Sequence, residues 1–186
     1  LSGDGSLTLN GTDITFTPSS NWFGSAIVSV SISDEEYLVE QSFTIIVLPI
    51  NDAPVASDFG ITLDEDSSIG ADFPVSDIDN ANNELSILIL SNPSLGVLVV
   101  DGLSATYTAN QDLNGIDVVE YKVTDGSLSS GSKFLTIQIN SINDAPVIDS
   151  IADQEVDEDN ALTLTLSAFD IDGDMLSYAA FDGDTD

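Results

Sequence analysis

The five-residue segment Asn-Asp-Ala-Pro-Val occurs twice, at residues 51–55 and 143–147, so its copies lie 92 residues apart. Two acidic segments recur at nearly the same spacing: Asp-Glu-Asp at 64–66 and 157–159, and Asp-Ile-Asp at 77–79 and 170–172. Repetition at a fixed interval is the signature of an array of similar structural units. The 186 residues therefore amount to about two units of ordinary domain size.

The charge balance limits the partners of this chain. It holds 33 Asp and Glu against two Lys and no Arg, a net charge of −31. Nucleic acid is excluded, because phosphate binding needs Lys and Arg, and an anionic membrane surface is disfavoured. Cations are favoured, calcium above all. A general role of the acid in solubility is the alternative, but dispersed acid would not repeat in register.

The missing residue types exclude further classes. Without Cys there is neither a disulfide nor a thiolate metal site, and without His the commonest general base and transition-metal ligand is absent. The sequence has no run of 18 apolar residues, so we expect no direct membrane insertion.

The apolar residues follow a period of two nearly everywhere. Val28, Val30 and Ile32 alternate with Ser, and residues 119–123 keep the same phase one interval later. Such alternation indicates half-buried strands. Within residues 53–142 seven strands are expected, near 59–63, 68–76, 85–90, 96–100, 104–108, 117–124 and 133–140. Seven short strands in a unit of this size predict an all-β fold, a Greek-key β-sandwich of immunoglobulin type.

The predicted domain organisation is one complete repeat flanked by two half repeats. Residues 1–52 match the second half of a repeat, 53–144 a complete repeat, and 145–186 the first half of another. Two interpretations remain open. The chain is an excerpt from a longer array, or half repeats of neighbouring subunits complete each other head to tail.

The repeated motifs resemble bacterial cadherin-like repeats, the calcium-dependent Ig-like modules of large surface adhesins. The resemblance rests on Asn-Asp-Ala-Pro, on the acidic triplet about ten residues later, and on the following Asp-Ile-Asp, all present twice in register. It implies tandem β-sandwiches joined by calcium-binding linkers. Animal cadherins carry a further Asp before the Asn-Asp pair, where this chain has Pro49 and Ser141. We therefore expect fewer calcium ions per joint.

The topology of a seven-strand sandwich predicts where the acidic residues meet. Alternate loops lie at alternate ends, so the loops after the second strand and between the last two strands lie beside the incoming linker. The residues brought together at this first joint are Asn51, Asp52, Asp77, Asp79 and Asp125. At the next joint the predicted set is Asn143, Asp144, Asp170, Asp172, Glu65 and Asp117.

Calcium suits these sets best, because it takes six to eight oxygen ligands in a flexible geometry. We expect Ca2+ to neutralise mutually repelling carboxylates and to turn a flexible joint into a rigid one. Magnesium demands a tighter octahedron, and zinc prefers His or Cys. The alternative for the Asn-Asp-Ala-Pro segment is a simple turn in which Asp accepts backbone hydrogen bonds.

These expectations define the predicted function: a calcium-rigidified structural or adhesive module of a secreted bacterial cell-surface protein. The alternative is a subunit of an extracellular filament assembled by complementation of half repeats. Neighbouring repeats of the same protein are the expected partners, with cell-surface glycans or other cells as further candidates. An enzyme is not expected, because the acids lie in linkers and strand ends rather than across one cleft. A lectin would need a calcium position open to solvent.

Overall fold

A computed structural model describes residues 3–181 of the chain. By internal contacts it divides into two compact units. The first comprises Leu1–Ser57, Pro74–Leu88 and Lys122–Ser132, and the second Asp58–Phe73, Ile89–Tyr121 and Lys133–Asp186. Residues 1–2 and 182–186, at the ends of the two predicted half repeats, lie outside the described part.

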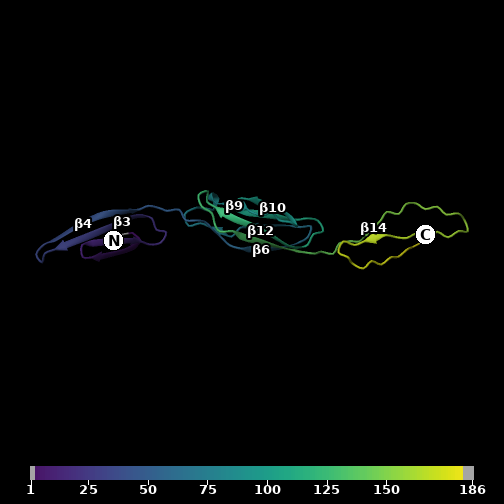
Figure 1. Ribbon diagram of the computed structural model, residues 1–186, viewed down its shortest axis with the longest axis horizontal. Coiled ribbons are helices and arrows are strands. Elements are labelled where there is room, and N and C mark those ends of the chain that lie inside the picture. The colour runs from purple at the N-terminus through teal and green to yellow at the C-terminus, as the bar shows by residue number, and fades with distance from the viewer. Residues whose placement is uncertain (1–2, 182–186) are drawn as a thin grey trace, which may run out of the picture. The chain divides into compact units, whose positions relative to one another are not determined.

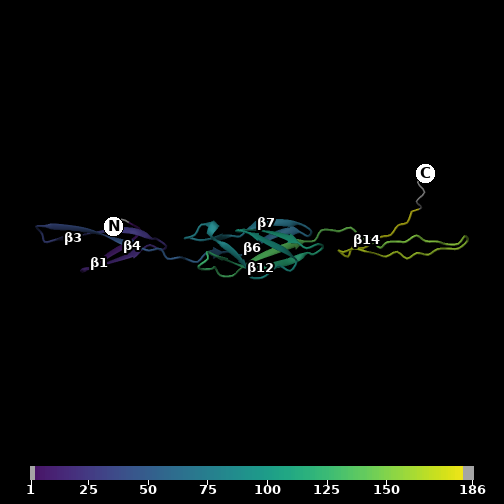
Figure 2. The same ribbon diagram turned by 90° about the horizontal axis from the view of Figure 1, so that it is seen from above.

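Within residues 3–181 the fold is all-β apart from one short 3-10 helix, which confirms the predicted fold class. The elements of the predicted complete repeat are β5 (Val55–Ala56), β6 (Phe59–Asp64), β7 (Ser68–Asp72), β8 (Val75–Ser76), η1 (Asn82–Glu84), β9 (Ser86–Ile89), β10 (Gly96–Asp101), β11 (Ser104–Ala109), β12 (Gly115–Thr124) and β13 (Lys133–Asn140). Figure 2 shows β6, β7 and β12 gathered in one body. One sheet has the order β10-β11-β7, and another has the order β6-β13-β12-β9.

The strand predicted over residues 68–76 is interrupted, which corrects the prediction. It ends as β7 at Asp72 and resumes as β8 at Val75, which pairs with β5 rather than with β11. Pro74 lies in the gap and cannot donate a backbone hydrogen bond to a continuous ladder. The chain therefore changes sheets at this proline.

The core lies where the alternating apolar residues of the two sheets meet. It consists of Leu63, Tyr107, Ala109, Val119, Leu135, Ile137 and Ile139. β6 runs parallel to β13, with Phe59 opposite Leu135 and Leu63 opposite Ile139. This pairing brings the first long strand of the repeat beside the last.

The amino-terminal residues form two hairpins, β1 (Gly5–Asn10) with β2 (Asp13–Pro18), and β3 (Gly24–Ser33) with β4 (Leu38–Val47). Figure 1 shows β3 and β4 running side by side. Towards the carboxyl end, β14 (Val147–Ile148) pairs with β15 (Ala168–Phe169), and residues 149–167 between them contain no assigned strand.

Candidate metal centres

The first junction comprises Asn51, Asp52, Asp77, Asp79 and Asp125. The backbone N–H of Asp52 donates to Asp79 Oδ2 at 2.7 Å. The side-chain amide of Asn51 donates to Asp125 Oδ2 at 2.7 Å and to its neighbour's carbonyl, Asp52 O, at 3.0 Å. The loop after β8 and the end of β12 thus meet the linker, where the topology argument placed them.

Local turns fix the orientation of these carboxylates. Asp77 Oδ1 accepts the backbone N–H groups of Asp79 and Asn80 at 2.7 and 2.9 Å. Asp125 Oδ1 accepts those of Ser127 and Leu128, both at 2.6 Å. Such Asx turns use one carboxylate oxygen and leave the other to point elsewhere. The Asn51 amide, followed by the backbone N–H groups of Leu128 and Ser127, lowers the pKa of Asp125 below its usual value.

The second junction comprises Glu65, Asn143, Asp144, Asp170 and Asp172, and it repeats this linker geometry. Asp144 N–H donates to Asp172 Oδ2 at 2.7 Å, and Asn143 Nδ2 donates to Asp144 O at 3.0 Å. Asp170 Oδ1 accepts the N–H of Asp172 at 3.0 Å. The repeated sequence motif therefore encodes a repeated local structure.

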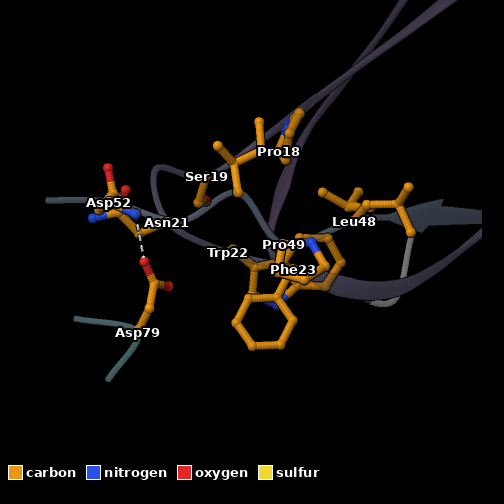
Figure 3. Close-up of a pocket in the computed structure, with 11 residues that line it drawn as sticks. Pro18, Ser19, Asn21, Trp22, Phe23, Leu48, Pro49, Asp52 and Asp79 are labelled. Carbon is orange, nitrogen blue, oxygen red and sulfur yellow. Dashed lines mark hydrogen bonds between the residues drawn. The ribbon is translucent and has the colours of Figure 1, made fainter. Parts of the chain in front are cut away.

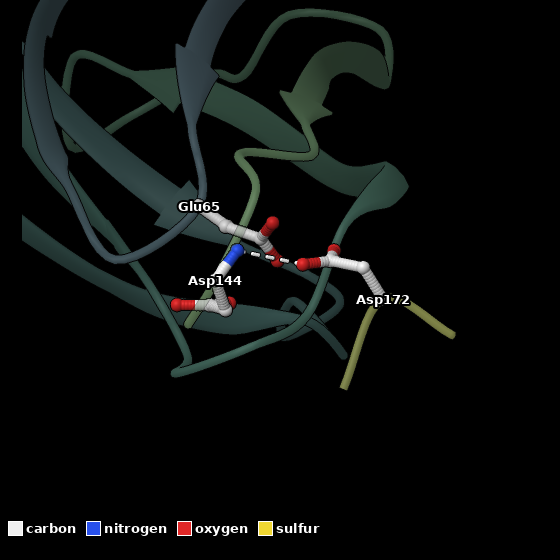
Figure 4. A group of neighbouring side chains, drawn as sticks. All are labelled: Glu65, Asp144 and Asp172. Carbon is white, nitrogen blue, oxygen red and sulfur yellow. Dashed lines mark hydrogen bonds between the residues drawn. The ribbon is translucent and has the colours of Figure 1, made fainter. Parts of the chain in front are cut away.

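Glu65 gives the second junction a further carboxylate. Its side chain is 5% exposed, and Oε1 accepts the backbone N–H of Ile142 at 2.7 Å. Figure 4 shows the side chains of Glu65, Asp144 and Asp172 close together. One carboxylate oxygen from each lies within 4.8 Å of the other two, which is the spacing of a shared cation site.

A second acidic group adjoins the first and shares Asp144 with it: Asp66, Asp112 and Asp144 also bring carboxylate oxygens within 4.8 Å of one another. Desolvation, then the charges of Asp112, Asp172, Asp66 and Glu65, raise the pKa of Asp144 above its usual value. The carboxylates of the second junction thus repel one another.

Asp66 and Asp112 were missed as candidate site residues. Asp66 ends the repeated acidic triplet, which was a usable signal. The residue that corresponds to Asp112 one interval earlier is Asn21. Both residues adopt the left-handed conformation, with φ of 55° for Asp112 and 58° for Asn21. The amide in place of a carboxylate hid the correspondence.

Asp117 was predicted at the second junction, and the structure places it elsewhere. Its side chain is 3% exposed. Its oxygens accept hydrogen bonds from Ser94 N–H at 2.9 and 3.0 Å, Leu95 N–H at 2.8 Å and the Tyr107 hydroxyl at 2.9 Å. Desolvation raises the pKa of Asp117, but these hydrogen bonds outweigh it, so the pKa lies below the usual value. Asp117 is a structural acceptor inside the sandwich, and we remove it from the ligand set.

Both junctions contain buried oxygen atoms that lack a hydrogen-bond partner: Asp77 Oδ2, Asn80 Oδ1 and Asp144 Oδ2. A buried polar atom without a partner is costly, and its presence calls for an unseen water or ion. Carboxylate and amide oxygens are the ligands that calcium prefers. The residues present therefore fit a calcium ion at each junction.

The surroundings of the two junctions differ. A pocket beside the first is lined by Trp22 and Phe23 as well as by Asp52 and Asp79 (Figure 3). The pocket at the second is mainly polar and includes Asp112, Asp172 and Asp174. The first junction therefore combines carboxylates with aromatic surface.

Comparison with known proteins places the fold. Residues 51–138 match the family of bacterial Ig domains. No curated protein matches the chain. Extracellular cadherin domains 1–5 of protocadherin gamma B2 are similar at 16% identity and a TM-score of 0.53, covering 89% of this chain and 37% of that one. At this identity the similarity concerns the fold alone.

Two further structures are more distant. An endo-fucoidan hydrolase of glycoside hydrolase family 107 gives 16% identity, a TM-score of 0.42, and coverage of 81% of this chain and 25% of that one. Domains 4 and 5 of the S-layer protein SbsC give 12% identity, a TM-score of 0.35, and coverage of 72% of this chain and 64% of that one. This chain thus spans about a quarter of the hydrolase. Within residues 3–181, no helix has the length and apolar character needed to cross a membrane.

Proposed function

We propose that the chain, whose residues 51–138 match the family of bacterial Ig domains and whose fold is similar to cadherin domains, is a calcium-stiffened structural or adhesive segment of an extracellular bacterial surface protein. In this proposal its work is mechanical and non-catalytic. Each linker binds Ca2+ together with acidic loops of the neighbouring repeats, so that occupancy converts a flexible joint into a rigid one.

The observation that carries this proposal is the matched geometry of the two linkers. Asp52 N–H reaches Asp79, and Asp144 N–H reaches Asp172, both at 2.7 Å. A turn alone would explain these two bonds. It would not explain why carboxylates gather until the pKa of Asp144 rises, or why carboxylate oxygens are left buried without partners. A divalent cation accounts for all three features.

The acidic charge balance and the resemblance of the repeated motifs to calcium-dependent cadherin-like repeats support calcium as the ion and neighbouring repeats as the partners. Extracellular calcium modules bind with Kd of about 10⁻⁴–10⁻³ M. At about ten times Kd, a single site adds about 1.4 kcal/mol to the free energy of unfolding. For a repeat of this size that corresponds to about 6–11 °C in melting temperature.

The test is thermal unfolding in about 5 mM calcium and in excess chelator, with magnesium as a second ion. We expect calcium to raise the midpoint and magnesium to raise it less. Asp101→Asn is the matched control, because Asp101 ends β10 outside both junctions and its counterpart one interval earlier is already Asn10. An unfolding midpoint that calcium leaves unchanged would contradict the proposal. So would a calcium-induced rise in midpoint that Asp101→Asn and Asp172→Asn reduce equally.

A further inference from the structure

β10 is an edge strand of the complete repeat, and its open side has no strand partner within residues 3–181. The sheet order β10-β11-β7 leaves β10 paired with β11 alone. Its sequence, Gly-Val-Leu-Val-Val-Asp, has no charge before Asp101 and no Pro. Charges and prolines are the usual protection of an edge, because an unprotected edge pairs with another strand. The open side of β10 is therefore suited to strand pairing.

The outward side chains of β10 are apolar although the fold does not require it. Val97 is 55% exposed and Val99 is 61% exposed. One interval earlier, in β1, the corresponding residues are Ser6 and Thr8. The same strand of the repeat thus forms with polar residues at both positions. The two valines on β10 therefore call for a role outside the packing of their own repeat.

The backbone of β10 presents hydrogen-bonding groups to the open side in a defined pattern. Asn110 N–H donates to Leu95 O at 2.9 Å, and β10 pairs with β11 in antiparallel register. Successive residues of an antiparallel strand direct their backbone groups to alternate sides. Leu95 and every second residue after it therefore bond to β11. The residues between them, Gly96, Leu98 and Val100, direct N–H and C=O groups to the open side.

We propose that β10 pairs in antiparallel fashion with β10 of a second copy of this chain, about a two-fold axis at Leu98. Such a contact is isologous, because both copies contribute the same surface. Leu98 lies opposite the partner's Leu98, and Gly96 lies opposite the partner's Val100. Every backbone group that faces the open side from these residues then has a partner. Val97 lies opposite the partner's Val99, and this apolar cross-strand pair occurs twice.

Charge favours this surface and this register for a contact between two copies. The chain has a net charge of −31, so two copies repel each other where their acidic surfaces meet. Residues 86–100 contain no charged side chain. In the proposed register Asp101 lies opposite the partner's Leu95, whereas a two-fold axis nearer the β10–β11 turn would bring the two Asp101 carboxylates together. Like charges directly opposite each other are destabilising.

The contact is independent of the calcium proposal. β10 carries no residue of either junction, so the association persists in excess chelator. Salt screens the repulsion between the two acidic copies, while backbone pairing and burial of the valines drive the contact. Association therefore strengthens with ionic strength. The contact links repeats of different copies, whereas each junction links consecutive repeats of one chain.

Disulfide trapping tests the register, since the chain has no native Cys. Mixing the variants Val97→Cys and Val99→Cys places one thiol opposite the other, in a pair whose Cα atoms lie about 4.5 Å apart. This separation is within disulfide reach. Under mild oxidation the mixture gives a covalent dimer. Each variant alone gives far less, because its two thiols are out of register by two residues. Equal cross-linking in the mixture and in the separate variants overturns the proposal.

Light scattering after size exclusion gives an independent readout of the unmodified chain. We expect an equilibrium between the 19.5 kDa monomer and a dimer, shifted to the dimer by concentration and by salt and unchanged by chelator. Val99→Glu weakens the dimer by about tenfold or more, because the two-fold axis brings two carboxylates into the contact. Ile116→Glu adds the same charge at a 63%-exposed position of β12 and leaves the dimer unchanged.

Two results of this measurement overturn the proposal. One is a chain that stays monomeric at every concentration, even if a synthetic peptide of residues 95–101 binds it, because the open edge would then accept a foreign strand rather than a second copy. The other is an equal effect of the two glutamate substitutions, because the association would then depend on net charge and not on β10.

Discussion

The two junctions share one linker geometry but differ in the charge around it. At the first, the Asn51 amide and backbone N–H groups satisfy Asp125 and lower its pKa. At the second, desolvation and four neighbouring carboxylates raise the pKa of Asp144. Hydrogen bonds already stabilise the ionised form at one joint, whereas the other joint concentrates charge that protein groups do not neutralise.

This difference indicates that the linker motif alone does not set the affinity of a joint. The motif supplies the scaffold, and two loops of the preceding repeat supply the extra carboxylates: the β6–β7 turn gives Glu65 and Asp66, and the β11–β12 loop gives Asp112. We therefore expect the second junction to bind calcium more tightly than the first. The following predictions test that ranking.

The largest effect is expected from removing two charges at the second junction. Asp144→Asn with Asp172→Asn removes two of the three carboxylates that meet there, and we expect calcium affinity at this site to fall about 100-fold. Titration calorimetry should then show only the weaker class of site. The matched pair Asp52→Asn with Asp79→Asn should remove the weaker class and leave the tighter one. If the Asp144 and Asp172 variant instead lost the weaker class of site, the first junction would be the tighter calcium site and the expected ranking would be wrong.

The second effect concerns Asp117, whose counterpart one interval earlier is Ala26. Asp117→Ala leaves the donors of Ser94, Leu95 and the buried Tyr107 without an acceptor. We expect a loss of about 2–4 kcal/mol in the free energy of unfolding, measured by urea denaturation. The loss should be equal with and without calcium, because Asp117 is a structural acceptor. A loss seen only in calcium would return it to the ligand set.

The same variant predicts a pH dependence. Because the pKa of Asp117 is lowered in the folded state, its contribution is present above the unfolded value of 3.8 and disappears as pH falls through the folded-state pKa. The stability difference between wild type and Asp117→Ala should therefore be constant near neutral pH and shrink below pH 3.8. A difference that grows on acidification would contradict the assigned hydrogen bonds.

A smaller effect is expected at the first junction. Asp125→Asn keeps the shape of the side chain but removes its charge, and we expect calcium affinity there to fall about 3–10-fold, the scale of about 1 kcal/mol. Trp22 is the only tryptophan and lines the pocket with Asp52 and Asp79, so its fluorescence reports on this junction. An unchanged titration would exclude Asp125 as a ligand.

The smallest effect is expected from Asp112→Asn. Asp112 is the strongest of the charges that raise the pKa of Asp144, so its removal should bring that pKa back towards the usual value. Carboxyl NMR titration in chelator measures this directly. Asp101→Asn is the control and should leave Asp144 unaffected. Calcium affinity should fall only slightly, because Asp112 lies in the neighbouring group rather than with Asp172.

The sequence predicted much of the fold because its information is periodic. Alternating apolar residues located the strands, and the repeated linker placed Asp77, Asp79 and Asp125 beside Asn51 and Asp52. It could not resolve choices made by packing. Asp117 stands at the first position of the strand predicted over 117–124 and reads as an acid at a strand end, yet strand β12 turns it inward to the Tyr107 hydroxyl. Pro74 marked the break in the second strand, but only the sheet order shows where the chain goes next.

The parallel pairing of β6 with β13 bears on how the module responds to tension. Six residue pairs join these strands, from Phe59 with Leu135 to Asp64 with Asn140. Because both strands run in the same direction, pulling the two ends of the repeat apart slides one strand along the other. The hydrogen bonds between the six pairs must then break together rather than one after another. Rupture is therefore slow, and the repeat withstands load.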